Sequence, residues 1–194
     1  MPALHGAITA ADGFLPVHLK TSYNPVIRGG NMSTIIHPIP PFLQQDSNIL
    51  ILGSFPSVKS RETGFYYGNP QNRFWKLLAY LYRSELPGSN EKKKDFLSQH
   101  RIALWDVVGS CTVHGSSDSS IRDVQVNRVS DLVFGTGIKA VFLNGQLAGR
   151  LYQSNRAMMP ILPSVIMPST SAANASNRLE DLMDAWRIIL DFNE

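Results

Sequence analysis

Four short apolar runs are spaced along the chain, and each ends in polar or small residues. They cover residues 49–52, 102–108, 139–143 and 164–167. Short apolar runs without alternation are typical of strands that are buried on both faces of a sheet. Each run therefore predicts a buried strand.

The segments between and after these runs carry apolar residues at helical spacing. We expect helices from residue 70 onward, over 91–100, over 126–134, from 145 to about 152, and over 177–192. Asn69 and Pro70 have the residue types of an N-cap and a first helical position. The last helix has one apolar stripe, which we assign to the core: Leu179, Leu182, Met183, Trp186, Ile189 and Leu190.

The alternation of strands and helices predicts an α/β fold, namely a three-layer α/β/α sandwich with a central, mainly parallel four-stranded sheet. Ligands of such sheets bind at the carboxyl ends of the strands. The segments after residues 52, 108, 143 and 167 fall at that edge, and residues 109–123 are predicted to form a long loop. We expect these segments to meet at one pocket.

The first 31 residues differ from the rest because they show no sustained period. They predict a flexible or loosely docked extension, followed by a single domain over residues 32–194. Residues 37–42, HPIPPF, predict an extended segment over a sheet edge, and packing is the favoured role for His37. We expect no secretory signal and no membrane span, and therefore a cytoplasmic protein. We also expect it to be a monomer.

Net charge and the numbers of cysteine and histidine residues limit the kinds of partner and site that this chain can have. A net charge of +3 over 194 residues permits a polyanionic partner without requiring one. Cys111 is the single cysteine, so the chain forms no internal disulfide and cannot hold an iron–sulfur cluster with four thiolates. The five histidines lack metal-ligand spacing, which predicts that there is no metal site and no cofactor.

Two long motifs carry a family resemblance. Residues 53–76 read GSFPSVKSRETGFYYGNPQNRFWK, and residues 167–174 read MPSTSAAN. The first resembles the opening motif of the uracil-DNA glycosylase superfamily, and the second resembles its last motif. The GSFP turn and the YYGNPxNxFW segment are most similar to the hypoxanthine-DNA (deoxyinosine) glycosylases. The resemblance runs from about residue 37 to the C-terminus and implies repair of DNA that contains deaminated bases.

The resemblance implies a group of base-binding residues: Ser54, Phe55, Tyr67, Asp106 and Asn144. Tyr67 matches the aromatic position that stacks on a flipped base. Phe55 stands where many relatives place a catalytic Asn or Asp, so catalysis must come from elsewhere. Asp106 would accept a hydrogen bond from N1–H of hypoxanthine. The alternatives are core packing for the aromatic residues, a cap for Asp106 and a turn for Asn144.

Asn69 and Asn72 are the candidate catalytic residues. The Asn69 amide can accept a hydrogen bond from a water molecule, and we rank it first for holding the attacking water. The alternative is that Asn69 only caps a helix. Asn72 ranks second, since in the resemblance it ties the loop to its neighbours.

Five residues are the candidate contacts to DNA phosphates: Ser57, Ser169, Thr170, Ser171 and Asn174. Hydroxyls and backbone amides ahead of a helix suit phosphate oxygens, although without the motif a plain helix cap is the favoured interpretation. Relatives insert a bulky side chain from the last loop into the base stack. Ala172 and Ala173 are small, so we expect a weaker wedge here.

The sequence lacks a GxSxG elbow and a paired-carboxylate spacing. We therefore expect hydrolysis by water that leaves an uncut abasic site. The first hypothesis is a monofunctional hypoxanthine-DNA glycosylase of base excision repair. The alternatives are a glycosylase for uracil or mispaired thymine, against which Phe55 argues, and a non-catalytic nucleic-acid-binding module on the same fold.

Overall fold

A computed structural model describes residues 28–29, 32–114, 121–174 and 177–192. Its centre is a four-stranded sheet in the order β4-β3-β7-β8, with every neighbouring pair parallel. The strands are β3 (Ile49–Gly53), β4 (Ile102–Asp106), β7 (Ala140–Asn144) and β8 (Ser164–Met167). All five residues of β3 are buried, as its unbroken apolar run predicts. The predicted parallel sheet is confirmed.

One face of this sheet packs against three helices. They are α2 (Phe74–Leu81), α3 (Asn90–Gln99) and α6 (Leu179–Trp186), which η3 (Arg187–Phe192) extends. Ile49 and Ile51 point to this side and share one apolar cluster with Phe74 and Trp186. The stripe predicted for the last helix lies in or against this cluster.

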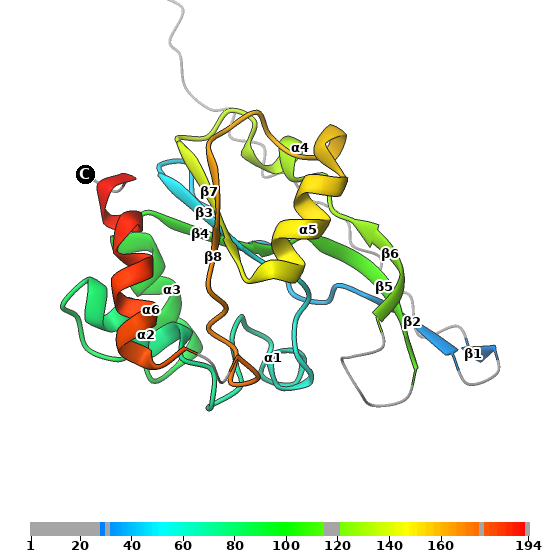
Figure 1. Ribbon diagram of the computed structural model, residues 1–194, viewed down its shortest axis with the longest axis horizontal. Helices are drawn as coiled ribbons and strands as arrows, with labels where there is room; N and C mark the ends of the chain where they lie inside the picture. Colours follow the sequence, from blue (N-terminus) through cyan, green and yellow to red (C-terminus); the bar gives the residue numbers. More distant parts are fainter. Residues whose placement is uncertain (1–27, 30–31, 115–120, 175–176, 193–194) are drawn as a thin grey trace, which may run out of the picture.

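Leu50 and Leu52 point to the opposite face, because successive side chains of a strand alternate. This face packs against α5 (Gln146–Ser154), followed by η2 (Arg156–Met158), and against the short α4 (Val129–Val133). Figure 1 shows the sheet between the two groups of helices. The predicted three-layer α/β/α arrangement is therefore confirmed. None of the helices in the described ranges is long and apolar enough to cross a membrane.

A second, antiparallel sheet was not predicted. Its order is β1-β2-β5-β6, formed by β1 (Arg28–Gly29), β2 (Met32–Ile36), β5 (Val108–His114) and β6 (Ile121–Val126). The long loop predicted over 109–123 is therefore wrong in its described part, and the helix predicted over 126–134 is reduced to α4. The β5–β6 pairing has two register shifts, and its polar, small residues hide the strand pattern in the sequence.

Residues 37–42 connect the two sheets. The His37 amide donates to the Gly109 carbonyl (2.8 Å), and Phe42 forms an antiparallel bridge with Leu104 on the edge strand β4. The predicted packing over a sheet edge is thus confirmed. Within the predicted extension, residues 28–29 pair with β2, and residues 1–27 and 30–31 lie outside the described residues.

The predicted helix start at Asn69 and Pro70 is wrong. A helix beginning there would direct the Arg73 amide to the Asn69 carbonyl, four residues back. That amide instead donates to the Thr170 carbonyl (3.0 Å), and the first bond of α2 runs from the Leu77 amide to the Arg73 carbonyl (2.8 Å). The Arg73 amide is therefore bonded to the loop that follows β8 rather than within a helix, and α2 begins at Phe74.

Candidate active site

A cavity of about 220 Å³ lies at the carboxyl ends of the parallel strands. The segments after β3, β7 and β8 meet there with Asp106, the last residue of β4, whereas the chain beyond Val108 leaves as β5. The lining includes ten of the residues that the sequence singled out, namely Ser54, Phe55, Ser57, Tyr67, Asn72, Asp106, Asn144, Ser169, Thr170 and Ser171. It also includes Gly53, Pro56, Ser60, Tyr66 and Leu147, which the sequence did not single out as site residues. Asn69 and Asn174 are not part of the lining.

Asp106 contributes a buried carboxylate that is 4% exposed. Its Oδ2 lies 2.8 Å from Nε2 of His37, and its backbone carbonyl accepts from the side-chain Nδ2 of Asn127 at 2.9 Å. A Cβ on Gly53 would lie only 2.2 Å from Asp106 Oδ1 and 3.3 Å from the Tyr67 hydroxyl oxygen. The absent side chain at Gly53 therefore leaves space for the carboxylate in this corner of the cavity.

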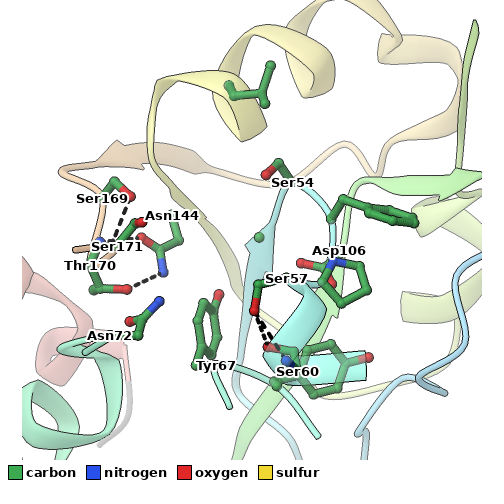
Figure 2. A pocket seen from close by; sticks show the side chains of 15 residues that line it. Ser54, Ser57, Ser60, Tyr67, Asn72, Asp106, Asn144, Ser169, Thr170 and Ser171 are labelled. Carbon is green, nitrogen blue, oxygen red and sulfur yellow. Dashed lines mark hydrogen bonds between the residues drawn. The ribbon is translucent and has the colours of Figure 1, made fainter. Parts of the chain in front are cut away.

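Tyr67 forms the wall between the two halves of the cavity. Its ring stacks on Phe74 with centroids 3.7 Å apart, and its φ of 53° lies in the left-handed region, which non-glycine residues rarely adopt. Figure 2 shows the ring between Asn72 and Asn144 on one side and Asp106 on the other. The packed, strained segment therefore fixes the ring in place.

The Tyr67 hydroxyl is buried and makes no hydrogen bond to another described residue. Burial raises its pKa far above the ordinary value, and the Asp106 charge raises it further, while the nearby Asn144 side chain lowers it. The hydroxyl therefore stays protonated in the physiological pH range and has a proton to donate toward the cavity.

Phe55 has a largely structural environment. Its ring makes an edge contact with the His37 imidazole, with centroids 5.7 Å apart, and packs against the small cluster of Val108 and Cys111. The Arg61 guanidinium lies 5.8 Å from the centroid of the ring. The ring still contributes to the cavity wall, so its two predicted roles are both compatible with its position.

The two candidate catalytic asparagines differ in position. Asn69 Oδ1 accepts from the Gln71 amide (2.9 Å), which closes a turn outside the cavity. Asn72 lines the cavity, and its Oδ1 accepts from the Phe74 amide (3.0 Å) at the start of α2. Figure 2 shows the Asn72 amide nitrogen directed toward the space between Thr170 and Tyr67. Of the two residues, Asn72 is the one placed for contact with a ligand.

Asn144 anchors the last loop. Its Oδ1 accepts from the Thr170 amide (3.0 Å), and its Nδ2 donates to the Thr170 hydroxyl (2.9 Å). Gly145, at φ 100°, brings the following turn so close to this loop that a Cβ would lie 2.9 Å from Ser169 Cβ. Asn144 retains a second lone pair for a ligand, since an amide side chain supports four hydrogen bonds.

Arg73 is a residue that sequence reasoning missed. Its guanidinium donates to the Ser171 carbonyl (2.8 Å), to the Asn174 carbonyl (3.0 Å) and to the Asn177 carbonyl. It thereby joins the first motif to the last, and its position inside NRFW was the available signal. Asn174 Nδ2 donates to the Ser169 carbonyl (2.8 Å), so the Asn174 side chain also braces the loop from outside the cavity.

The predicted phosphate contacts from serine hydroxyls also have local partners. Ser57 caps the short α1 (Val58–Thr63), where its Oγ accepts from the Ser60 amide (3.2 Å). Ser169 Oγ accepts from the Ser171 amide (3.2 Å). The Ser57 hydroxyl also lies 3.1 Å from the Ser60 hydroxyl, whereas the Ser169 hydroxyl can cap the loop and still donate its own proton to a phosphate.

Among the residues that the structure describes, no three His, Cys, Asp or Glu side chains gather as metal ligands. The cavity chemistry therefore rests on one buried carboxylate, side-chain amides, hydroxyls and an aromatic ring. Such a set can accept a hydrogen bond from a flat heterocycle, stack on it and hold a water molecule beside it.

Comparisons with known proteins identify the family of this chain. Residues 40–190 match the model of the Uracil DNA glycosylase superfamily. A Methanosarcina acetivorans protein named hypoxanthine DNA glycosylase is 37% identical over 137 residues, which are 70% of this chain and 85% of the relative. A Methanosarcina barkeri protein of the same name is 34% identical over 149 residues, covering 76% and 92%.

A solution NMR structure provides a third comparison. It is of a Methanosarcina acetivorans protein described as a candidate uracil DNA glycosylase, with 33% identity and a TM-score of 0.67. The match covers 80% of this chain and 99% of that one. This chain therefore belongs to the uracil DNA glycosylase superfamily.

Proposed function

We propose that this chain is a hypoxanthine-DNA glycosylase, which hydrolyses the bond between deoxyribose and a flipped hypoxanthine base and leaves an abasic site. Two relatives that carry this name cover most of the chain at 37% and 34% identity. Its partner is DNA that contains deaminated bases, on which it acts as a cytoplasmic monomer without a cofactor. The observation that carries the proposal is the Asp106 carboxylate, which lies in the cavity beside the Tyr67 ring.

Base recognition follows from this pair of side chains. Hypoxanthine presents an N1–H donor beside an O6 acceptor. Asp106 Oδ1, beside Gly53, accepts from N1–H. One face of the Tyr67 ring is covered by Phe74, so the other face is left for the flipped base.

Bond cleavage builds positive charge on the sugar and negative charge on the departing base. Asn72 holds the attacking water, because its amide nitrogen points into the cavity and its Oδ1 has a second lone pair. As C1′ loses its bond to the base, the water oxygen forms the new bond, a water proton is released, and the base leaves with the electron pair. Asn69 takes a supporting role in the turn that presents Asn72.

The last loop supplies the DNA contacts. Ser169 and Ser171 line the cavity, and their hydroxyls are the proposed contacts to the flanking phosphates. Thr170 is fully buried and its hydroxyl accepts from Asn144 Nδ2, so it supports the loop rather than contacting a phosphate. Arg73 adds a positive charge directly behind this loop. Ser57 faces the opposite rim and contributes a further hydroxyl.

The test is single-turnover cleavage of labelled duplexes that contain one deoxyinosine, deoxyuridine or deoxyadenosine, with alkali added to reveal abasic sites. We expect strand breaks after alkali in the deoxyinosine duplex and none without alkali. Faster excision of uracil than of hypoxanthine would favour the uracil alternative. Binding without excision of either base would favour the non-catalytic module.

A further inference from the structure

His37 lies behind the cavity, and only 4% of its side chain is exposed. His37 follows β2 of the antiparallel sheet, whereas Asp106 ends β4 of the parallel sheet. The contact between the two side chains therefore joins the two sheets. His37 Nε2 lies 2.8 Å from Asp106 Oδ2, which is the oxygen opposite the one at Gly53.

The second ring nitrogen identifies the tautomer. The Ile39 backbone amide donates to His37 Nδ1 at 3.3 Å, and an amide can only be the donor in such a bond. Nδ1 must therefore present its lone pair, and the ring hydrogen is on Nε2. It follows that a neutral imidazole donates to the carboxylate and that Asp106 Oδ2 is an acceptor.

The imidazole is fixed on three sides. Phe55 meets its ring edge-on with centroids 5.7 Å apart, and the Tyr66 ring lies 6.3 Å away at 40°. The His37 backbone amide is bonded to the Gly109 carbonyl. The ring therefore has contacts of its own that do not depend on Asp106, and from this position it can orient the Asp106 carboxylate.

We propose that His37 is a positioning residue that holds Asp106 through Oδ2 and aims its Oδ1 at the base as a hydrogen-bond acceptor, so that this pair of side chains separates hypoxanthine from adenine. This inference rests on the proposed function. N1 of hypoxanthine carries a hydrogen that Oδ1 can accept, whereas N1 of adenine carries a lone pair that faces the carboxylate. A fixed acceptor therefore attracts the deaminated base and repels the normal one.

A purely structural role for His37 makes a different prediction. If the imidazole only fills space, a side chain of similar volume should restore activity whether or not it donates a hydrogen bond. If His37 positions Asp106, only those side chains that can donate a hydrogen bond to Asp106 should support activity. Gln places its amide nitrogen near the position of Nε2, while Leu fills part of the space without a donor, and Asn is one methylene too short to reach Asp106.

The experiment compares His37→Gln, His37→Leu and His37→Asn with the wild type in single-turnover excision and in DNA binding, on deoxyinosine and deoxyadenosine duplexes. His100→Leu serves as the matched control, because His100 is a partly buried histidine away from the cavity lining. We expect His37→Leu and His37→Asn to lose on the order of 10- to 100-fold in hypoxanthine excision rate, with binding to the duplex retained. His37→Gln should recover most of the rate and keep the preference over adenine.

Equal rates for Gln, Leu and Asn at position 37 would overturn the assignment, as would wild-type activity in His37→Leu. If His37→Leu does not fold in a thermal unfolding assay, the Gln and Asn pair decides the question. Failure of the proposed function has a separate outcome, which is a wild type that excises no hypoxanthine. That result would overturn both proposals. An active wild type whose His37 variants all excise hypoxanthine at the same rate would overturn only the proposed role of His37.

Discussion

Replacement of Arg73 by Met should loosen the last loop while leaving α2 in place. Met keeps an apolar stem of similar length but removes the guanidinium. That group makes three close bonds, to the carbonyls of Ser171, Asn174 and Asn177. Longer contacts run from the same group to the Thr170 carbonyl (3.4 Å) and the Ser169 carbonyl (3.5 Å). The change therefore removes the hydrogen-bond donor of the segment that carries the proposed phosphate contacts.

The magnitude follows from the number and exposure of these bonds. A hydrogen bond to a charged group contributes about 1.5–3 kcal/mol, although such contributions are not additive. Arg73 is only half-buried, so water can reach the freed carbonyls, and we expect a total loss of about 2–3 kcal/mol in the free energy of unfolding. Single-turnover excision should fall on the order of 10-fold or more, because the loop no longer holds the substrate in place.

Urea denaturation and single-turnover excision measure the two effects, with Lys76→Met as the control, since Lys76 is exposed on the same helix. Arg73→Lys should behave like Arg73→Met, because one ammonium group cannot reproduce the spread of the guanidinium donors. Unchanged stability and rate in Arg73→Met would refute the reasoning, because the guanidinium bonds would then contribute nothing.

Three further predictions concern conditions. Because the proposed mechanism uses an amide and a carboxylate rather than a metal, excess EDTA should leave the excision rate unchanged, and a clear loss of activity would contradict it. Binding to a deoxyinosine duplex should weaken tenfold or more between about 50 and 200 mM salt, measured by fluorescence anisotropy, and a flat salt dependence would argue against phosphate contacts. Burial lowers the pKa of His100 below its ordinary value of 6.5, so the unfolded chain takes up the proton first as the pH falls. The urea midpoint should therefore decrease from pH 7 to about 5 in the wild type and decrease less in His100→Phe; equal decreases would count against this assignment.

The parallel sheet was predictable from the sequence because its strands are buried on both faces. A run such as ILIL in β3 reports its own burial without knowledge of its neighbours. The antiparallel sheet was not predictable in the same way. β5 mixes Val108 and Cys111 with Gly109 and Ser110, and its pairing with β6 shifts register twice, so no regular alternation marks it.

In the candidate site, too, the features marked by local sequence were predictable and those set by distant contacts were not. Tyr67 lies in the first motif after the predicted strand over 49–52, and Asp106 lies near the end of the predicted strand over 102–108, so both could be assigned to the carboxyl edge of the sheet. The choice between Asn69 and Asn72 depended on where α2 begins, and that is decided by the Thr170 carbonyl, 97 positions beyond Arg73. Local propensity contains no information on such a contact.

His37 and Arg73 were missed as site residues for a related reason. His37 contacts Asp106 across 69 positions, and Arg73 bonds to carbonyls about 100 positions away. A lone histidine in a proline-rich segment and an arginine ahead of a helix have ordinary interpretations in a sequence. Only the folded structure shows that His37 contacts Asp106 and that Arg73 binds the carbonyls of the last loop.

The most direct test of the account is single-turnover hypoxanthine excision by folded Asn72→Ala beside folded Asn69→Ala. The account places Asn72 in the cavity and Asn69 in the turn that supports it. It predicts a loss on the order of 100-fold or more for Asn72→Ala, with binding to the deoxyinosine duplex retained, and a rate near that of the wild type for Asn69→Ala. Near-normal excision by Asn72→Ala together with a collapse in Asn69→Ala would contradict it.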